Sequence, residues 1–165
     1  MKPITLTLTV NGQRFNVTTE PNKTLLYLLR DDLGFVGAKD ACGGEGECGA
    51  CTVLLDGEPV NACLVLAGQA HQRDVETIEG LARDGELHPL QRSFVETGGV
   101  QCGFCTPGAI MAAKALLDRS PQPDDAEIQE ALSGNLCRCT GYSKMMEAVR
   151  VAARRVAAME MNNGH

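Results

Sequence analysis

Eight cysteines carry most of the chemistry that this sequence can offer. The chain opens on the alternating strand pattern MKPITLTLTVNG rather than on a signal peptide, so we expect a cytoplasmic protein whose thiols stay reduced. Reduced cysteines gathered in groups of four are typical of metal sites rather than of disulfides. The two groups are Cys42, Cys48, Cys51 and Cys63, and Cys102, Cys105, Cys137 and Cys139.

The first group has the spacing C-x5-C-x2-C-x11-C in and after the glycine-rich loop CGGEGECGAC. Plant-type ferredoxins hold a [2Fe–2S] cluster with C-x4-C-x2-C and a distant fourth cysteine. Glycines allow the positive φ angles of so tight a loop, and their N–H groups can form a nest for cluster sulfurs. The spacing therefore predicts a [2Fe–2S] site, with one extra residue between Cys42 and Cys48. Zinc on four thiolates is the alternative, although zinc sites usually have two CxxC pairs.

The second group has the less specific spacing C-x2-C-x31-C-x1-C. Its residues alone leave three readings open, namely an iron–sulfur cluster, a zinc site and a redox dithiol at Cys102 and Cys105. Both cysteine pairs lie in segments between predicted helices, QCGFCTPG and NLCRCTGY. Two such turns can face each other at one end of a helical bundle. Arg138 then either offsets the charge of a cluster or is a solvated surface residue.

The elements that must position these cysteines change in kind near residue 78. Before it, Asn11-Gly12 and Asp56-Gly57 are hairpin signals between runs of alternating or apolar residues. A run with helical spacing ends at Gly34. The predicted strands are residues 4–10, 13–19, 52–55, 59–63 and 75–77, and the predicted helix is residues 24–34.

After residue 78, apolar residues recur at spacings of three and four, which is typical of helices. Asp124 and Glu127 form a capping-box pattern at one helix start. The predicted helices are residues 87–97, 107–117, 124–132 and 142–158. The chain is therefore predicted to be α+β, with a β-rich unit at 1–78 and an all-α bundle of four helices at 79–165.

Composition excludes several classes of function. The net charge is −6 with no run of lysine and arginine, which argues against nucleic acid or an anionic membrane as partner. No stretch of about 18 apolar residues predicts a membrane span. We find no pattern for a nucleophile, a general base or a substrate pocket, so no residue is predicted to be catalytic.

Three motifs in this order carry a family resemblance: GAKDACGGEGECGACTVLLDG, VQCGFCTPGAIM and LSGNLCRCTGY. Together they resemble the small iron–sulfur subunit of the xanthine dehydrogenase family of molybdenum hydroxylases, over residues 3–158. The resemblance implies a plant-ferredoxin-like β-grasp domain at 1–78 whose [2Fe–2S] cluster is held by the first cysteine group. It also implies an all-helical domain at 79–165 whose second [2Fe–2S] cluster is held by the other group.

The function that the resemblance implies is electron transfer within an oxidoreductase complex. Electrons would pass from molybdopterin in a large subunit through both clusters to FAD in a medium subunit. Gln101 matches a glutamine that contacts the pterin, and Cys139 matches the cluster ligand nearest to it. The unfused small chain implies a heterotrimer or a dimer of heterotrimers, with the cytosine dinucleotide form of the pterin. The alternatives are a free-standing two-cluster ferredoxin and a zinc-stabilised binding module.

The substrate lies outside what this chain encodes, because in the family the substrate pocket belongs to the large subunit. Xanthine, an aldehyde, an N-heterocycle, carbon monoxide and an aromatic acyl-CoA all remain open. The extra residue after Cys42 bears only on the fine tuning of the first cluster.

Overall fold

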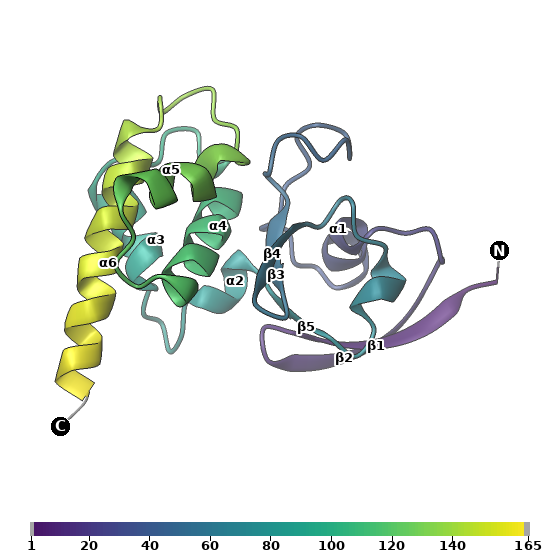
Figure 1. Cartoon of the computed structure of the whole chain (residues 1–165). Helices are drawn as coiled ribbons and strands as arrows, with labels where there is room; N and C mark the ends of the chain where they lie inside the picture. Colours follow the sequence, from purple (N-terminus) through teal and green to yellow (C-terminus); the bar gives the residue numbers. More distant parts are fainter. Residues whose placement is uncertain (1, 164–165) are drawn as a thin grey trace.

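A mixed sheet forms the first half of the chain and helices form the second (Figure 1). The computed structural model describes residues 2–163. The sheet has five strands in the order β2-β1-β5-β3-β4. The strands are β1 (Ile4–Val10), β2 (Gln13–Thr19), β3 (Thr52–Leu55), β4 (Glu58–Asn61) and β5 (Asp74–Glu76). The central strand β5 is parallel to β1 and antiparallel to β3, so the sheet is mixed.

The two hairpins follow from their turn residues. Asn11 and Gly12 have φ angles of 52° and 80°, and Asp56 and Gly57 have φ angles of 51° and 84°. Consecutive positive φ angles are the requirement of a type I′ turn, whose twist matches that of the flanking strands. The first turn places Val10 opposite Gln13, and this pairing fixes the register of β1 and β2 as far as Ile4 and Thr19. In this register alternate side chains of β1 point into the core.

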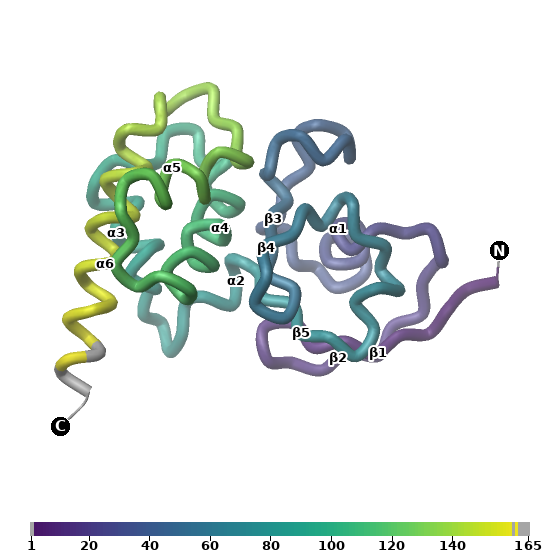
Figure 2. Tube along the Cα trace, viewed as in Figure 1, coloured from purple at the N-terminus to yellow at the C-terminus, as the bar shows by residue number. Residues whose placement is uncertain are grey.

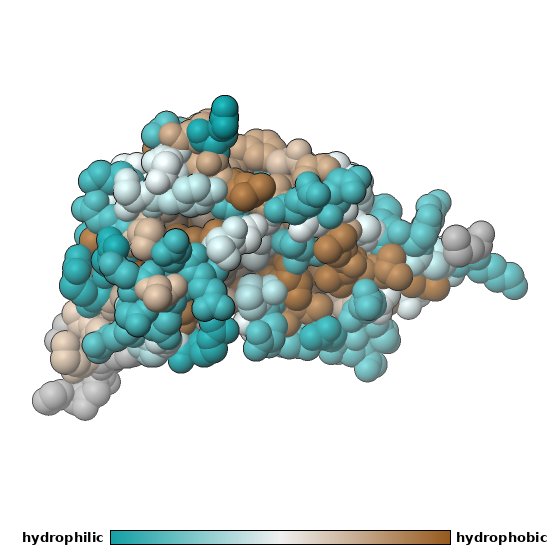
Figure 3. Space-filling model, turned by 45° about the horizontal axis from the view of Figure 1, so that its top comes forward, coloured by the Kyte–Doolittle hydropathy of each residue, from teal (hydrophilic) through white to brown (hydrophobic). Residues whose placement is uncertain are grey.

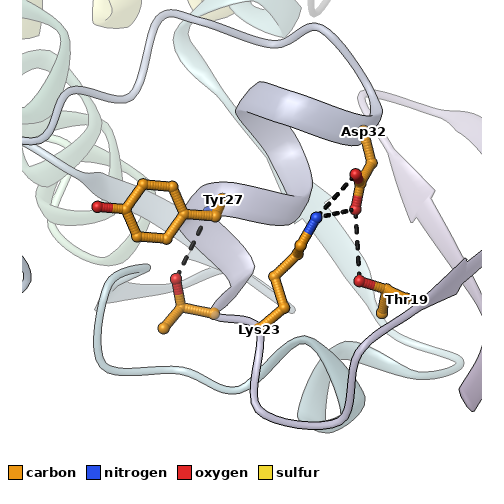
Figure 4. A network of polar contacts seen from close by, with 5 residues as sticks. Thr19, Lys23, Tyr27 and Asp32 are labelled. Carbon is orange, nitrogen blue, oxygen red and sulfur yellow. Dashed lines mark hydrogen bonds and ion pairs between the residues drawn. The ribbon is translucent and has the colours of Figure 1, made fainter. Parts of the chain in front are cut away.

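A short helical segment covers one face of the sheet. It consists of α1 (Leu25–Tyr27) and a π-helical turn, η1 (Leu28–Asp32), and its four leucines are fully buried. Lys23 Nζ bonds both carboxylate oxygens of Asp32 at 2.8 and 2.9 Å, which ties the start of the segment to its end (Figure 4). The predicted helix is confirmed in place. Its π turn was not predicted, and it arises because Leu33 N donates to Leu28 O, five residues back.

The second half contains the four predicted helices. They are α3 (Pro89–Glu96), α4 (Thr106–Arg119), α5 (Asp125–Ser133) and α6 (Ser143–Asn163). The capping box that starts α5 is confirmed, since Asp124 and Glu127 exchange side-chain to backbone bonds of 2.8 and 2.9 Å. The predicted end of the last helix at Ala158 was wrong, because α6 continues to Asn163. Two short turns were also not predicted, η2 (Ala67–Ala70) and α2 (Ile78–Leu81).

The two halves have separate hydrophobic cores that meet at one strand. The core of the sheet half draws its buried residues from positions 6–75, and the core of the helical half draws most of its own from 81–153. Leu54 of β3 belongs to the helical core, and α4 packs against β3 and β4. The chain crosses from one half to the other after β5 (Figure 2). The predicted domain boundary at residue 78 stays a prediction.

Across residues 2–163, none of the helices combines the length and the apolar character that a membrane span needs.

Candidate iron–sulfur sites

The first cysteine group lies in the irregular segment between η1 and β3 and in the turn after β4. Cys42 and Cys48 are half-buried, whereas Cys51 and Cys63 are buried. The predicted strand at 59–63 was too long. It ends at Asn61, and Leu64 N then donates to Asn61 O at 2.9 Å, so Cys63 sits in a turn that directs the chain back toward the cysteine loop.

The thiols of this group are arranged in pairs. The backbone N–H of Glu47 and the side chain of Cys48 bond Cys42 and lower the pKa of its thiol to about 7. Burial raises the pKa of Cys51 to about 12, and its side chain is in hydrogen-bond contact with Cys63. The half-buried Cys42 therefore favours its thiolate form, whereas the buried Cys51 ionises only beside a strong positive charge.

The doubled glycine of the loop is held from outside the site. The Asp40 carboxylate accepts from Gly43 N at 2.8 Å and from Tyr27 Oη at 2.6 Å, and the Tyr27 bond lowers the pKa of Asp40. The predicted nest of inward N–H groups is therefore incomplete at Gly43, whose N–H bonds a carboxylate instead. Glu45 and Glu47 of the same loop are exposed.

The second group joins two turns of the helical half. Cys102 and Cys105 precede α4, and Cys137 and Cys139 lie between α5 and α6. Cys139 Sγ is 3.6 Å from Cys102 Sγ, and Cys105 is hydrogen-bonded to Cys137. The two turns thus face each other, with one pair of thiols exposed and the other pair half-buried.

Thr140 and Tyr142 shape the surroundings of Cys137. Thr140 Oγ1 lies 3.1 Å from Cys137 Sγ, and Cys137 N donates to Tyr142 Oη at 2.7 Å. Burial of Cys137 opposes its ionisation, yet the bonds from Thr140 lower its pKa to about 7. Burial raises the pKa of Cys105 to about 12. The second group therefore repeats the division of the first into an ionisable thiol and a desolvated one.

The donor set fits a binuclear cluster. The cysteines approach in pairs, and two thiolates on each of two irons is the ligand set of a [2Fe–2S] cluster. Such a cluster also supplies the positive charge that deprotonates a coordinating thiol outright. Its chemistry, when bound, would be one-electron transfer.

Exposed apolar residues flank the second group. Phe104 is 45% exposed and precedes Cys105, and Leu136 is 56% exposed and precedes Cys137. Gln101, the predicted pterin contact, is exposed next to Cys102. Figure 3 brings the top of the molecule in Figure 1 forward and shows patches of apolar surface among hydrophilic residues. Arg138 is exposed, which agrees with its reading as a surface residue.

Comparison with known proteins accounts for both halves of the chain. Residues 8–84 match the 2Fe-2S iron-sulfur cluster binding domain, and residues 77–150 match the [2Fe-2S] binding domain. The nicotinate dehydrogenase small FeS subunit of Eubacterium barkeri is 55% identical over 157 residues, which are 95% of this chain and 99% of that protein. The chain belongs to the small iron–sulfur subunits of the xanthine dehydrogenase family.

Other members of this family agree in sequence and in structure. The xanthine dehydrogenase iron-sulfur-binding subunit of Escherichia coli O157:H7 is 45% identical, over 88% of this chain and 92% of that protein. The crystal structure of quinoline 2-oxidoreductase from Pseudomonas putida 86 superimposes with a TM-score of 0.89 at 41% identity, over 94% of this chain and 98% of that chain. The predicted fold class is confirmed, as is the assignment to an oxidoreductase complex.

In an iron–sulfur subunit, the hydroxyl group of Thr140 is placed to influence the reduction potential of a cluster. It lies 3.1 Å from Cys137 Sγ and 3.0 Å from Met145 Sδ, and a thiolate is the stronger acceptor of its single proton. This bond strengthens when reduction makes the cysteine sulfur more negative. Thr140→Val should therefore lower the reduction potential of a cluster that Cys137 ligates by about 40 mV, which corresponds to about 1 kcal/mol for one electron.

A redox titration followed by EPR measures this shift. Thr97→Val is the matched control, because Thr97 Oγ1 donates to backbone carbonyls, Ser93 O at 2.8 Å and Lys144 O at 3.5 Å, rather than to a cysteine sulfur. An unchanged potential in Thr140→Val would mean that the hydroxyl is turned to Met145 instead.

Proposed function

We propose that this chain is the electron-transfer subunit of a molybdenum-containing hydroxylase, relaying electrons from a molybdopterin centre through two [2Fe–2S] clusters to FAD. One observation carries the two-cluster relay. The two groups of four cysteines lie on loops in direct contact, since Leu136 N donates to Cys48 O at 2.9 Å. Contact between the two loops would keep the two redox centres close together, and a short separation favours electron exchange.

The proposed ligand sets are those that the sequence predicted. We assign the first cluster to the ferredoxin-type domain at 1–78 and the second to the helical domain at 79–165. The chain's own residues hold and tune the clusters through burial, backbone N–H groups and the hydroxyl of Thr140. The first set is Cys42, Cys48, Cys51 and Cys63, and the second is Cys102, Cys105, Cys137 and Cys139.

The second cysteine group should face the molybdopterin subunit. Its exposed thiols, Cys102 and Cys139, lie on the same two loops as the exposed Phe104 and Leu136, and a partner would cover such an apolar and redox-active surface. Gln101 stands on the same surface, where it would contact the pterin in its cytosine dinucleotide form, with Cys139 as the nearest cluster ligand. The first group would face the FAD subunit, in a cytoplasmic heterotrimer or a dimer of heterotrimers.

The test is the metal and sulfide content of the chain co-purified with its partner subunits, with EPR after dithionite reduction. We expect about four irons per chain and two distinct S = 1/2 signals, together with molybdenum and flavin in the preparation. Zinc in place of iron would overturn the redox assignment. A monomeric iron–sulfur protein without molybdenum or flavin would overturn the complex in favour of a free ferredoxin.

A further inference from the structure

Asn135 joins the two cysteine loops across the boundary between the halves. It is 3% exposed, and its Nδ2 donates to Gly49 O at 2.8 Å and to Thr52 Oγ1 at 3.2 Å. Its neighbour Leu136 donates its N–H to Cys48 O. The side-chain amide of Asn135 and the backbone amide of Leu136, both in the second cysteine loop, thus bond the carbonyl groups of two consecutive residues in the first cysteine loop.

The contact leaves no room for a side chain. A Cβ added at Gly108 would lie 2.3 Å from Gly49 O, and a Cβ added at Gly49 would lie 2.2 Å from Gly134 O. Helix α4 and the turn after α5 therefore meet the first cysteine loop backbone to backbone. We call this contact the seam, and its residues are Gly49, Thr52, Gly108, Gly134 and Asn135.

Each side of the seam is anchored close to proposed cluster ligands. Gly49 lies between Cys48 and Cys51, and Asn135 lies two residues before Cys137. Any change in the width of the seam therefore changes the separation of the two cysteine groups. Electron exchange and magnetic interaction between two centres both weaken as that separation grows.

We propose that Asn135 is the positioning residue that fixes the distance between the two clusters and thereby their electronic coupling. This inference rests on the proposed two-cluster function. The hydrogen bonds at the seam indicate that Asn135 positions the two loops, in addition to any contribution that it makes to the stability of the fold. Gly49 O also accepts from Thr52 Oγ1 at 2.7 Å and from Thr52 N at 3.1 Å, so it keeps partners within its own half when the amide of Asn135 is removed. The acceptor is not orphaned, and the large cost of an unsatisfied buried group is avoided.

The test is Asn135→Ala in the full chain, co-purified with the subunits it binds. The iron and sulfide contents are measured first. The second measurement is the magnetic splitting of the EPR signals, which arises when both clusters are reduced and lie close together. We expect full iron, unchanged g-values for each cluster in partly reduced samples, and loss of the splitting when both clusters are reduced. A role in stability alone would not move the splitting while both clusters remain intact.

Asn61→Ala is the matched control. Asn61 Nδ2 donates to Gly46 O at 3.0 Å, so this variant removes an equivalent amide bond to the same loop. The backbone of Asn61 pairs with Thr52, but the substitution changes only the side chain and leaves both bonds of Asn135 in place. We expect the splitting to survive in it. Loss of the splitting in both variants would overturn the inference, because general loosening of the loop would then explain the result.

A second variant keeps the test decisive if Asn135→Ala loses iron. Gly108→Ala puts a methyl group against Gly49 O, although alanine is the better helix former by about 1 kcal/mol. Gly134→Ala is its control, because nothing lies within 4 Å of a Cβ added there. The splitting should shrink in the first variant and persist in the second. If the Gly108→Ala protein retains all its iron and shows the same splitting as the wild-type protein, the inference is overturned. If the wild-type protein itself lacks two clusters, the proposed function is overturned instead.

Discussion

Replacing Cys139 by serine is expected to remove about half of the iron and one of the two EPR signals, and to reduce substrate-dependent turnover to background. The thiolate is the soft ligand that an iron–sulfur cluster requires, and a serine hydroxyl at the same place is a poor substitute. Cys139 faces Cys102 across 3.6 Å on the exposed side of the second group, and all eight cysteines of the chain are already assigned to the two groups, so none is left to replace it. The measurements are iron and sulfide content, EPR after reduction, and turnover with substrate and with a direct donor to FAD.

The direct donor separates a broken relay from a damaged complex. In the proposed relay, electrons that enter at FAD do not need the second cluster, so the flavin subunit should still be reduced by its own redox partner. Cys48→Ser is the reciprocal control. It should remove the other EPR signal and leave the one that Cys139→Ser abolishes. Full substrate turnover in Cys139→Ser, with all iron retained, would contradict both the ligand assignment and the proposed route.

The parts of this fold that the sequence predicted well are those that neighbouring residues decide. Asn11-Gly12 and Asp56-Gly57 specify their hairpins because few other residue pairs accept two positive φ angles in a row. The helix start at Asp124 was predicted for the same kind of reason, since both partners of its capping box lie within one turn.

Features that depend on distant partners were beyond the sequence. Leu54 sits on a strand of the sheet half but packs into the helical core, and hydrophobic alternation does not say which core a side chain joins. The π turn that ends at Asp32 buries Leu28 and Leu29 in the core of the sheet half, and helical spacing in the sequence does not distinguish a π turn from an α turn.

The cysteines show the same division. Their number and spacing predicted two groups, but four cysteines can pair in three ways, and only the structure selects Cys102 with Cys139. The polar residues that hold the loops were also missed. Asp40, Thr140 and Asn135 each stand within two or three residues of a cysteine, which was the available signal. Their partners lie elsewhere in the fold or depend on loop geometry, so their roles could not be read from spacing.

Phe94→Ala should cause the largest loss of stability among substitutions outside the cysteines. Phe94 on α3 is fully buried in the helical core, and truncation of a buried phenylalanine costs about 3–5 kcal/mol through lost burial and the cavity that remains. Domains of ordinary stability have about 5–15 kcal/mol in total. The loop that carries Cys102 follows directly from α3, so retention of the second cluster should fall together with the midpoint of denaturant unfolding.

Phe104→Ala is the control that separates packing from partner recognition. Phe104 is 45% exposed and precedes Cys105, so its removal creates no cavity and should change the free energy of unfolding by less than about 0.5 kcal/mol. If a molybdopterin subunit covers this surface, Phe104→Ala should instead weaken association of the subunits, because exposed aromatic residues are frequent anchors of interfaces. Phe94→Ala should therefore have the larger effect on the unfolding midpoint of the chain. Phe104→Ala should have the larger effect on co-purification of the chain with its partner subunits. Equal destabilisation by both would contradict the burial that separates them, and full subunit association in Phe104→Ala would count against the proposed docking of the second cysteine group.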